Sequence, residues 1–234
     1  MEFIIYEDAQ LLLVHKPAGI PVQTKSLSQK DMVSILKNYR AQKGEEPYIA
    51  VVHRLDQPVE GLLLLARTAQ AAAQLSEQFQ KRMVDKYYRA VVYNERNAPL
   101  SAGESGRLTD YLWKDPKQNL SMAVSEGTKG ARKAVLQYRV LKTKDRFAEL
   151  SVLLETGRHH QIRVQMANAG LPLAGDLKYG WTGDVMFQGT AKHPALCADQ
   201  ISFIHPITKQ KMEFHTKPQN PIFQLLQEHP DISS

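Results

Sequence analysis

The chain has 234 residues, enough to bury a core as one large domain or as two lobes that share a sheet. Its 30 Lys and Arg residues outnumber 24 Asp and Glu residues, which gives a formal net charge of +6, a pI near 9.3 and a preference for a polyanionic partner such as nucleic acid. With 43% hydrophobic residues the protein is not disordered, and its one cysteine, Cys197, excludes a disulfide framework and a cysteine-based metal site.

The N-terminal segment does not resemble a targeting sequence. Met1–Asp8 carries acidic residues where a signal peptide needs basic ones, and the longest apolar runs are far shorter than a membrane span. We therefore expect a soluble, cytoplasmic protein that is a monomer and does not contact a membrane. We expect Cys197 to be a small buried hydrophobic residue.

The first elements of the chain are predicted to be a strand and a helix. Leu11–Val14 is typical of a buried strand, and Lys16–Gly19 is typical of the turn that follows it. Ser28 with Asp31 resembles a capping box, which predicts a helix that continues to about Tyr39.

Two strands are then expected around a turn at Asp56, the first extending from Val51 and ending before Pro58. Thr68 is the expected N-cap of an alanine-rich helix, Ala69–Met83. The apolar residues that recur at helical spacing along it, and that we expect to face the core, are Ala72, Leu75, Phe79 and Met83.

The second half of the chain is predicted to be mostly strands, with a helix at His159–Asn168 that Gly170 caps. The basic segment Lys114–Lys133 fits either a mobile loop that contacts phosphates or a solvated connection between strands. Asn94–Gly106 is expected to be a polar surface excursion. The predicted strands are Lys86–Tyr93, Ala134–Leu141, Phe147–Leu154, Gln200–Phe203 and Lys211–His215, and a short helix is expected after Pro221.

The predicted strands outnumber the helices and are joined by short turns. The fold class expected is therefore α+β with a mixed, mainly antiparallel sheet, and we expect one domain over residues 1–234.

Two segments carry a high density of polar side chains. In the first, Arg54 and Asp56 are two residues apart and would point to the same face of an extended segment, whereas His53 would point to the other face. A carboxylate there is exposed at the mouth of a turn and is fixed by the apolar run Leu62–Ala66. The alternative for this pair is an ordinary surface contact beside a core strand.

The second segment is Glu155–Gln165, which contains Arg158, His159, His160 and Arg163. On a helix, His159 and Arg163 would share a face. An arginine in this position can keep a carboxylate ionised and oriented, and the alternative is a structural ion pair on a helix surface.

Together these residues resemble the RluA-type RNA pseudouridine synthases. The resemblance covers roughly residues 4–218 and rests on four blocks in the same order as in the family. The blocks are Leu13–Gly19; His53–Asp56 with Gly61–Ala66; Thr156–Arg158 with His160–Arg163, Gly175–Asp176 and Tyr179–Gly180; and Phe203, His205–Pro206 and Thr208.

The resemblance implies the pseudouridine synthase fold, with helices around a central RNA-binding cleft, and an enzyme that isomerises uridine to pseudouridine in structured RNA, either rRNA or tRNA, without a cofactor. Asp56 matches the catalytic aspartate, which either adds covalently or promotes a glycal intermediate. Arg163 matches the arginine that pairs with it. Tyr88 matches the tyrosine that stacks on the target base, with Tyr87 as its rival. Arg54 matches the arginine that displaces the target nucleotide.

His53 and Arg158 are further candidates for substrate binding, although for His53 a structural hydrogen bond is the stronger interpretation. The spacings of His159, His160, His193 and His205 fit no metal motif. Trp113 and Trp181 are expected to pack rather than to stack on RNA.

The chain departs from the family at Val59-Glu60, where Thr-Ser is usual, and at Gln165, where histidine is common. These departures affect the expected substrate preference more than the chemistry. The first block begins so near residue 1 that we expect no S4 domain before it, so RNA binding falls to the catalytic domain.

Two other functions compete with this one. The first is an RNA-binding or RNA-chaperone protein with dispensable chemistry. The second is a hydrolase of glycosidic bonds, which would need a second carboxylate opposite Asp56, for which Glu60 is the only nearby candidate.

Overall fold

The computed structural model describes residues 3–26, 28–182 and 192–226. The chain forms two compact units: unit 1 comprises Met1–Lys86 and Cys197–Pro218, and unit 2 comprises Tyr87–Leu196 and Gln219–Ser234. Both units combine mainly antiparallel strands with helices, so the predicted α+β class is confirmed. That residues 1–234 form one domain stays a prediction.

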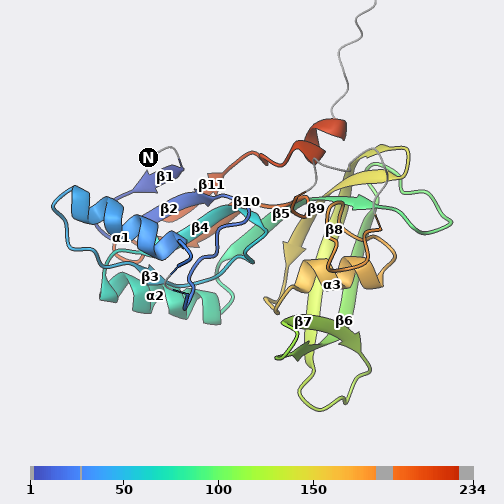
Figure 1. Ribbon diagram of the computed structural model, residues 1–234, viewed down its shortest axis with the longest axis horizontal. Coiled ribbons are helices and arrows are strands. Elements are labelled where there is room, and N and C mark those ends of the chain that lie inside the picture. Colours follow the sequence, from blue (N-terminus) through green and yellow to red (C-terminus); the bar gives the residue numbers. More distant parts are fainter. Residues whose placement is uncertain (1–2, 27, 183–191, 227–234) are drawn as a thin grey trace, which may run out of the picture. The chain divides into compact units, whose positions relative to one another are not determined.

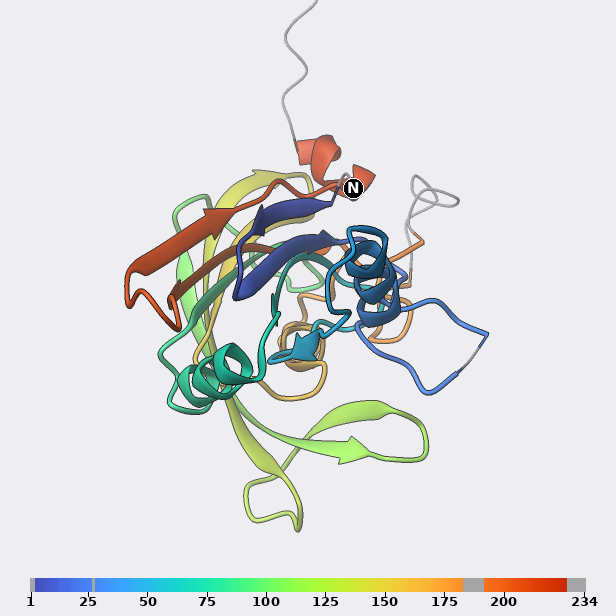
Figure 2. The same cartoon turned by 90° about the vertical axis from the view of Figure 1, so that its left-hand side faces the viewer.

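Unit 1 is a sheet with two helices beside its strands (Figures 1 and 2). The strand order is β1-β2-β4-β10-β11, and β3 pairs with the last residues of β4. All pairs are antiparallel except β4 with β10. The elements are β1 (Ile4–Glu7), β2 (Leu11–Lys16), α1 (Met32–Gln42), β3 (Ala50–Val51), β4 (Glu60–Ala66), α2 (Ala69–Gln80), β10 (Leu196–Ile204) and β11 (Lys211–His215).

The core of unit 1 lies around β2 and β4, which are buried at every position. A strand covered on both faces reads as a continuous apolar run, and Leu62–Ala66 has this pattern. Leu75 of α2 packs on the face that contains Leu64, whereas Phe79 is only partly buried there. Cys197 has no exposed surface, as expected.

One of the two predicted helix N-caps is confirmed and the other is displaced. Thr68 caps α2 as predicted, since its hydroxyl accepts a hydrogen bond from the amide of Ala71 at 3.2 Å. The N-cap of α1 is Asp31 and not Ser28, because the Asp31 carboxylate accepts the amide of Ser34 at 2.7 Å and so completes a capping box one turn later in the sequence. The predicted core position of Met83 is wrong: α2 ends at Gln80, and Met83 is 53% exposed.

Unit 2 is an antiparallel sheet of order β5-β9-β8-β6-β7, with α3 beside it (Figure 1). Val164 of α3 packs on Leu112 and Ala134 of the sheet and on Tyr179. Trp181 is buried, as expected. The elements are β5 (Asp85–Tyr93), β6 (Ser105–Asp115), β7 (Leu120–Val124), β8 (Arg132–Lys144), β9 (Phe147–Leu154), α3 (Gln161–Asn168) and the 3-10 helix η2 (Pro221–Leu226).

The basic segment Lys114–Lys133 is not a loop. It contains the end of β6, all of β7 and the start of β8, and Trp113 pairs with Met122 across the β6–β7 hairpin. The interpretation as a connection between strands is the closer of the two, although part of the segment is itself strand. The predicted strands Ala134–Leu141 and Phe147–Leu154 lie within β8 and β9, which form a hairpin with its turn at Asp145 and Arg146.

Helix α3 begins two residues later than predicted, because its N-cap, His160, adopts a left-handed conformation (φ 54°). His159 therefore precedes the helix, and the predicted i, i+4 pairing of His159 with Arg163 is wrong. The C-terminal cap at Gly170 is confirmed: its φ is 70°, and the amide of Leu171 donates to the carbonyl of Met166 at 2.9 Å, as in a Schellman motif.

Candidate active site

The segment that carries Asp56 is an irregular turn on buried anchors. β3 ends at Val51, so the predicted strand through Asp56 is wrong; the chain bends at residues 52–53 instead. Leu55 and Val59 are buried on either side of Asp56, and the amide of Val59 donates to the Asp56 carbonyl at 3.0 Å. Asp56 is therefore half-buried on a fixed turn, and Arg54 is exposed beside it.

Lys16 joins this turn to the one after β2. It has no exposed surface, and its ammonium donates to the carbonyls of Pro17 (2.8 Å), Ile20 (2.8 Å) and Gln57 (3.1 Å). The amide of Gly19 also donates to the Gln57 carbonyl at 2.9 Å. The residue next to Asp56 is thus fixed by a buried cation.

The charges around Lys16 are complementary. Burial lowers the pKa of Lys16 to about 8, while the carboxylates of Asp56 and Glu60 act in the opposite direction. A cation near Asp56 favours its ionised form, which is the form a nucleophile or base needs. Glu60 is itself buried, and its Oε2 lies 3.6 Å from Nε2 of His15.

His53 has a structural contact. Its Nε2 accepts a hydrogen bond from the amide of Leu64 at 2.9 Å, and its ring stacks on Phe79 at 4.7 Å between centroids. Burial lowers the pKa of His53 to about 3, with Lys86 acting in the same direction, so the ring is neutral. Its role in substrate binding stays a prediction.

In unit 2, Arg163 is held by two side chains. Its Nε and Nη2 donate to the two carboxylate oxygens of Asp176, each at 2.7 Å, and its guanidinium carbon lies 4.9 Å from the centre of the Tyr179 ring. Arg163 and Asp176 are buried. The predicted interaction of Arg163 with Asp56 stays a prediction.

A hydrogen-bonded chain supports Tyr179. Its hydroxyl accepts a hydrogen bond from the amide of Ser121 at 3.0 Å and lies 2.6 Å from Nδ1 of His160. Burial, followed by Arg163, lowers the pKa of His160 to about 2, so the ring is neutral. His159 stacks on His160 and lies 2.8 Å from the Ser121 hydroxyl.

The other predicted residues of unit 2 lie on its sheet and at its edge. Tyr88 is buried in β5, on the same face as Ala90, whereas Tyr87 is half-buried and points to the other face. Arg158 is part of the loop before α3, and its Nε donates to the carbonyl of Lys133 at 2.9 Å.

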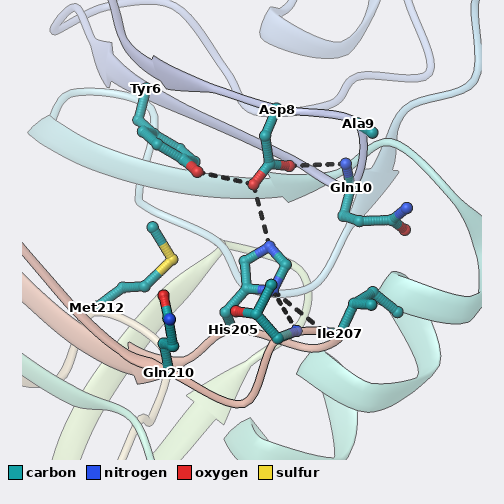
Figure 3. A pocket seen from close by; sticks show the side chains of 9 residues that line it. Tyr6, Asp8, Ala9, Gln10, His205, Ile207, Gln210 and Met212 are labelled. Carbon is teal, nitrogen blue, oxygen red and sulfur yellow. Dashed lines mark hydrogen bonds and ion pairs between the residues drawn. The ribbon is translucent and has the colours of Figure 1, made fainter.

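The fourth motif block forms a structural clip in unit 1, shown in Figure 3. Nε2 of His205 lies 3.0 Å from Asp8, while its Nδ1 accepts from the amides of Ile207 (3.2 Å) and Thr208 (2.9 Å). Asp8 also accepts from the hydroxyl of Tyr6 at 2.8 Å. These contacts surround a pocket of about 290 Å³, and they connect the β1–β2 turn to the β10–β11 turn.

The structure thus assembles two groups of candidate residues. Unit 1 brings Asp56 together with Lys16 and places Arg54 and His53 in the same segment; unit 2 contains Tyr88, Arg163 and Arg158. Lys16, Asp176 and Tyr179 were part of the motif blocks but had been given no role. Only Lys16 carried a separate signal, a charged residue directly after an apolar strand.

Comparisons with known proteins agree with these blocks. A family model described as RNA pseudouridylate synthase matches residues 10–168, which include Asp56, Tyr88 and Arg163. The chain belongs to this family. It is 33% identical over 231 residues to the ribosomal large subunit pseudouridine synthase D of Neisseria meningitidis serogroup B, with 95% of this chain and 60% of that protein covered.

Other members of the pseudouridylate synthase family are as similar. The uncharacterized RNA pseudouridine synthase YlyB of Bacillus subtilis is 34% identical over 215 residues, covering 90% of this chain and 67% of that protein. The chain spans about 60% of the length of the synthase D relatives from Neisseria.

No helix among the described residues is long and apolar enough to cross a membrane.

Solved structures of family members show the same fold. The human RNA pseudouridylate synthase domain containing 4 aligns with a TM-score of 0.74 at 23% identity, covering 98% of this chain and 95% of that one. The human domain containing 1 aligns with a TM-score of 0.72 at 21% identity, covering 96% and 86%. The predicted pseudouridine synthase fold is confirmed.

Proposed function

We propose that this protein isomerises uridine to pseudouridine in RNA, with Asp56 as the catalytic carboxylate. The observation that carries the proposal is the Asp56 turn: a half-buried carboxylate is fixed by the buried anchors Leu55 and Val59 and lies in the field of the buried Lys16 ammonium. Membership of the family supports the same reaction.

The reaction needs few groups. The bond between N1 of uracil and C1′ of ribose breaks, the base rotates while it remains bound, and C5 bonds to C1′. The C5 proton is lost and N1 gains one, so the composition of the RNA does not change. An ionised carboxylate and a base-binding surface are sufficient for such a step, and no cofactor is invoked.

The remaining candidates take roles around Asp56 in this proposal. Arg163, oriented by Asp176 and Tyr179, interacts with the Asp56 carboxylate. Tyr88 stacks on the uracil. Arg54 is exposed on the Asp56 turn and helps to extrude the target nucleotide, which must leave its helix or stacked loop before reaction.

The substrate we propose is structured RNA, with ribosomal RNA of the large subunit as the first choice. Synthase D relatives from several bacteria are named as ribosomal large subunit enzymes. The net charge of +6 suits a polyanion. We further propose that the protein acts as a cytoplasmic monomer.

The test uses RNA labelled with tritium at C5 of uridine, prepared from cells that lack the gene. Because the C5 proton is lost, wild-type protein should release tritium to water, and Asp56→Asn should release none above background while it binds the RNA with the same Kd. Asn keeps the shape of the side chain and removes only the charged oxygen. Activity of Asp56→Asn within a few-fold of wild type rejects the assignment of Asp56.

A further inference from the structure

We propose that residues 111–133, which we call the basic hairpin, bind the RNA backbone through a phosphate-binding face around Lys114 and Arg132. This inference rests on the proposed function, since it requires an RNA substrate. It assigns a substrate-binding surface to residues that have no role in the chemistry above. The basic hairpin consists of the end of β6, all of β7 and the start of β8 (Figure 1).

The basic hairpin carries cations that have no ion pair. It contains five Lys or Arg residues and two acidic residues, which gives a net charge of +3. All five cationic residues are exposed, and none forms an ion pair with a residue that the structure describes. Elsewhere, exposed cations such as Lys81 and Arg107 pair with Glu77 and Glu155. The five unpaired cations are Lys114, Lys117, Lys129, Arg132 and Lys133.

The carboxylates near these cations accept other donors. Asp115 accepts a hydrogen bond from the amide of Lys117 at 2.7 Å and so fixes the β6–β7 turn. Glu126 accepts from the hydroxyl of Tyr111. Asp110, which directly precedes the hairpin, accepts from two side chains of α3 at 2.7 and 2.9 Å. The three carboxylates therefore stabilise the hairpin and its contact with α3, and the five cations remain available to a partner.

Two of the cations share one face of the sheet. Arg132 pairs with Leu112 across β8 and β6, and directly opposed residues point to the same face. Lys114 is two residues beyond Leu112 in β6, so its side chain points to this face as well. Leu112 packs on Val164 of α3, which identifies the face as the one that α3 contacts. Lys114 and Arg132 therefore flank Leu112 and can contact one stretch of RNA backbone.

The phosphate-binding face is adjacent to other polar groups of unit 2. The ammonium of Lys178, also exposed, donates to a backbone carbonyl of the β6–β7 turn at 2.9 Å and adds a further cation there. Ser121, the partner of Lys114 across the hairpin, donates its amide to the hydroxyl of Tyr179 at 3.0 Å. The Tyr179 ring in turn contacts Arg163. RNA on this face would thus lie beside the group that holds a catalytic candidate of unit 2.

The chemistry of the surface favours RNA over a protein partner. Phosphates pair with exposed Lys and Arg side chains and release counterions, and such contacts position a nucleic acid without reading its sequence. The cores of protein–protein interfaces are instead depleted in lysine. A group of unpaired cations on an ordered hairpin therefore fits a sugar–phosphate backbone.

The test compares the double variant Lys114→Gln/Arg132→Gln with the matched control Arg139→Gln/Lys142→Gln, which removes two exposed cations from the rest of β8. The probe is large-subunit ribosomal RNA from cells that lack the gene. At about 150 mM salt the apparent Kd should rise about 10-fold in the first variant, and the slope of log Kd against log salt should fall by about 1.5. Both quantities should stay close to wild type in the control.

A second measurement separates binding from chemistry. Single-turnover tritium release by Lys114→Gln/Arg132→Gln should be slow at low RNA concentration and should recover at saturating RNA, because the face binds the backbone away from the reacting atoms. A rate that stays low at saturating RNA contradicts a role in binding alone and overturns the inference.

A direct readout of the contact is photo-crosslinking. A photoreactive diazirine side chain at position 114, in the Asp56→Asn background, should crosslink to the same RNA, and one at position 142 should not. No crosslink at 114, or a Kd and salt slope that do not differ between Lys114→Gln/Arg132→Gln and its control, overturns the inference; a hairpin that contacts a protein instead would give this result. The proposed function still stands if wild-type protein releases tritium, and it is rejected if wild-type protein releases none.

Discussion

Lys16 shows how one side chain fixes the turn that carries Asp56. A lysine is almost never fully buried unless it is paired, and here three carbonyls and two nearby carboxylates compensate for the loss of water. One of those carbonyls belongs to Gln57, the neighbour of Asp56. The stability of the turn and the position of the carboxylate therefore depend on the same ammonium.

We predict that Lys16→Met lowers the free energy of unfolding by about 3 kcal/mol, because it removes a buried ammonium that donates to three carbonyls. Activity should fall even where the protein is fully folded, since the Gln57 carbonyl loses one of the two hydrogen bonds that hold it. Chemical denaturation and tritium release measure the two effects. Lys25→Met, at an exposed position, is the control; equal results for the two variants would contradict the role of Lys16.

Arg163 offers a second test at this scale. We predict that Arg163→Met and Asp176→Asn each destabilise the protein by about 3 kcal/mol, because each leaves a buried charge or polar group without its partner, and that the double variant loses less than the sum. The control is Arg107→Met, which breaks a bidentate pair with Glu155 in an exposed position and should cost at most about 1 kcal/mol. Strict additivity of Arg163→Met and Asp176→Asn would show that the pair is not coupled.

At the scale of elements, the parallel pairing of β4 with β10 depends on Gly61. Gly61 has a φ of 117°, and a Cβ at this position would lie 2.4 Å from the carbonyl oxygen of Ala198, its partner in the parallel pair. Backbone atoms cannot move aside as a flexible side chain can. The strand pairing that follows the Asp56 turn therefore requires glycine.

We predict that Gly61→Ala destabilises unit 1 by about 3 kcal/mol or more, from the clash together with the strained φ. Gly127→Ala is the matched control: its φ is also positive, at 87°, but no atom lies within 4 Å of the added methyl group. It should cost about 1 kcal/mol. The melting temperatures of both variants test this prediction, and equal decreases in melting temperature would show that the close approach to Ala198 has no energetic effect.

The elements also show where sequence patterns succeed and fail. Long apolar or alternating runs located β2, β5, β9 and β10, because burial selects those patterns directly. The start of α1 was ambiguous in the sequence because Ser28 and Asp31 are both suitable N-cap residues. Asp31 also accepts a hydrogen bond from the amide of Thr24, a contact that the local sequence pattern does not predict. The bend at His53 likewise involves a hydrogen bond from the amide of Leu64 in β4, which is distant in the sequence.

For the whole molecule, two neutral histidines contribute to the response to acid. The pKa of His53 is lowered to about 3 and that of His160 to about 2, in both cases first by burial. In the unfolded chain a histidine titrates near pH 6.5, so the unfolded state binds more protons below that pH. The stability from these groups is complete above about pH 6.5 and is lost progressively as the pH falls toward the folded pKa values.

We predict that the melting temperature falls between pH 7 and pH 5, with His53 alone contributing a loss of about 2 kcal/mol at pH 5. His53→Gln keeps an acceptor for the Leu64 amide and should flatten this dependence. His215→Gln, at an exposed position, should not change it. A pH dependence that is the same in both variants would contradict the neutral state of His53.

The catalytic candidates themselves were accessible from the sequence because the motif blocks keep their order over most of the chain, and the family match covers the same residues. What the sequence did not reveal were the supporting contacts. Lys16 with Gln57 and Arg163 with Asp176 are separated by 41 and 13 residues, and only the folded units bring them together.

The central claim, that this chain makes pseudouridine through Asp56, is tested most directly by mapping pseudouridines in total RNA. The RNA would come from cells that lack the gene and carry either the wild-type gene or the Asp56→Asn variant, expressed at equal levels. We predict at least one uridine in large-subunit ribosomal RNA that is converted with the wild-type gene and unconverted with Asp56→Asn. Identical maps for the two, or restoration of every site by Asp56→Asn, would contradict it.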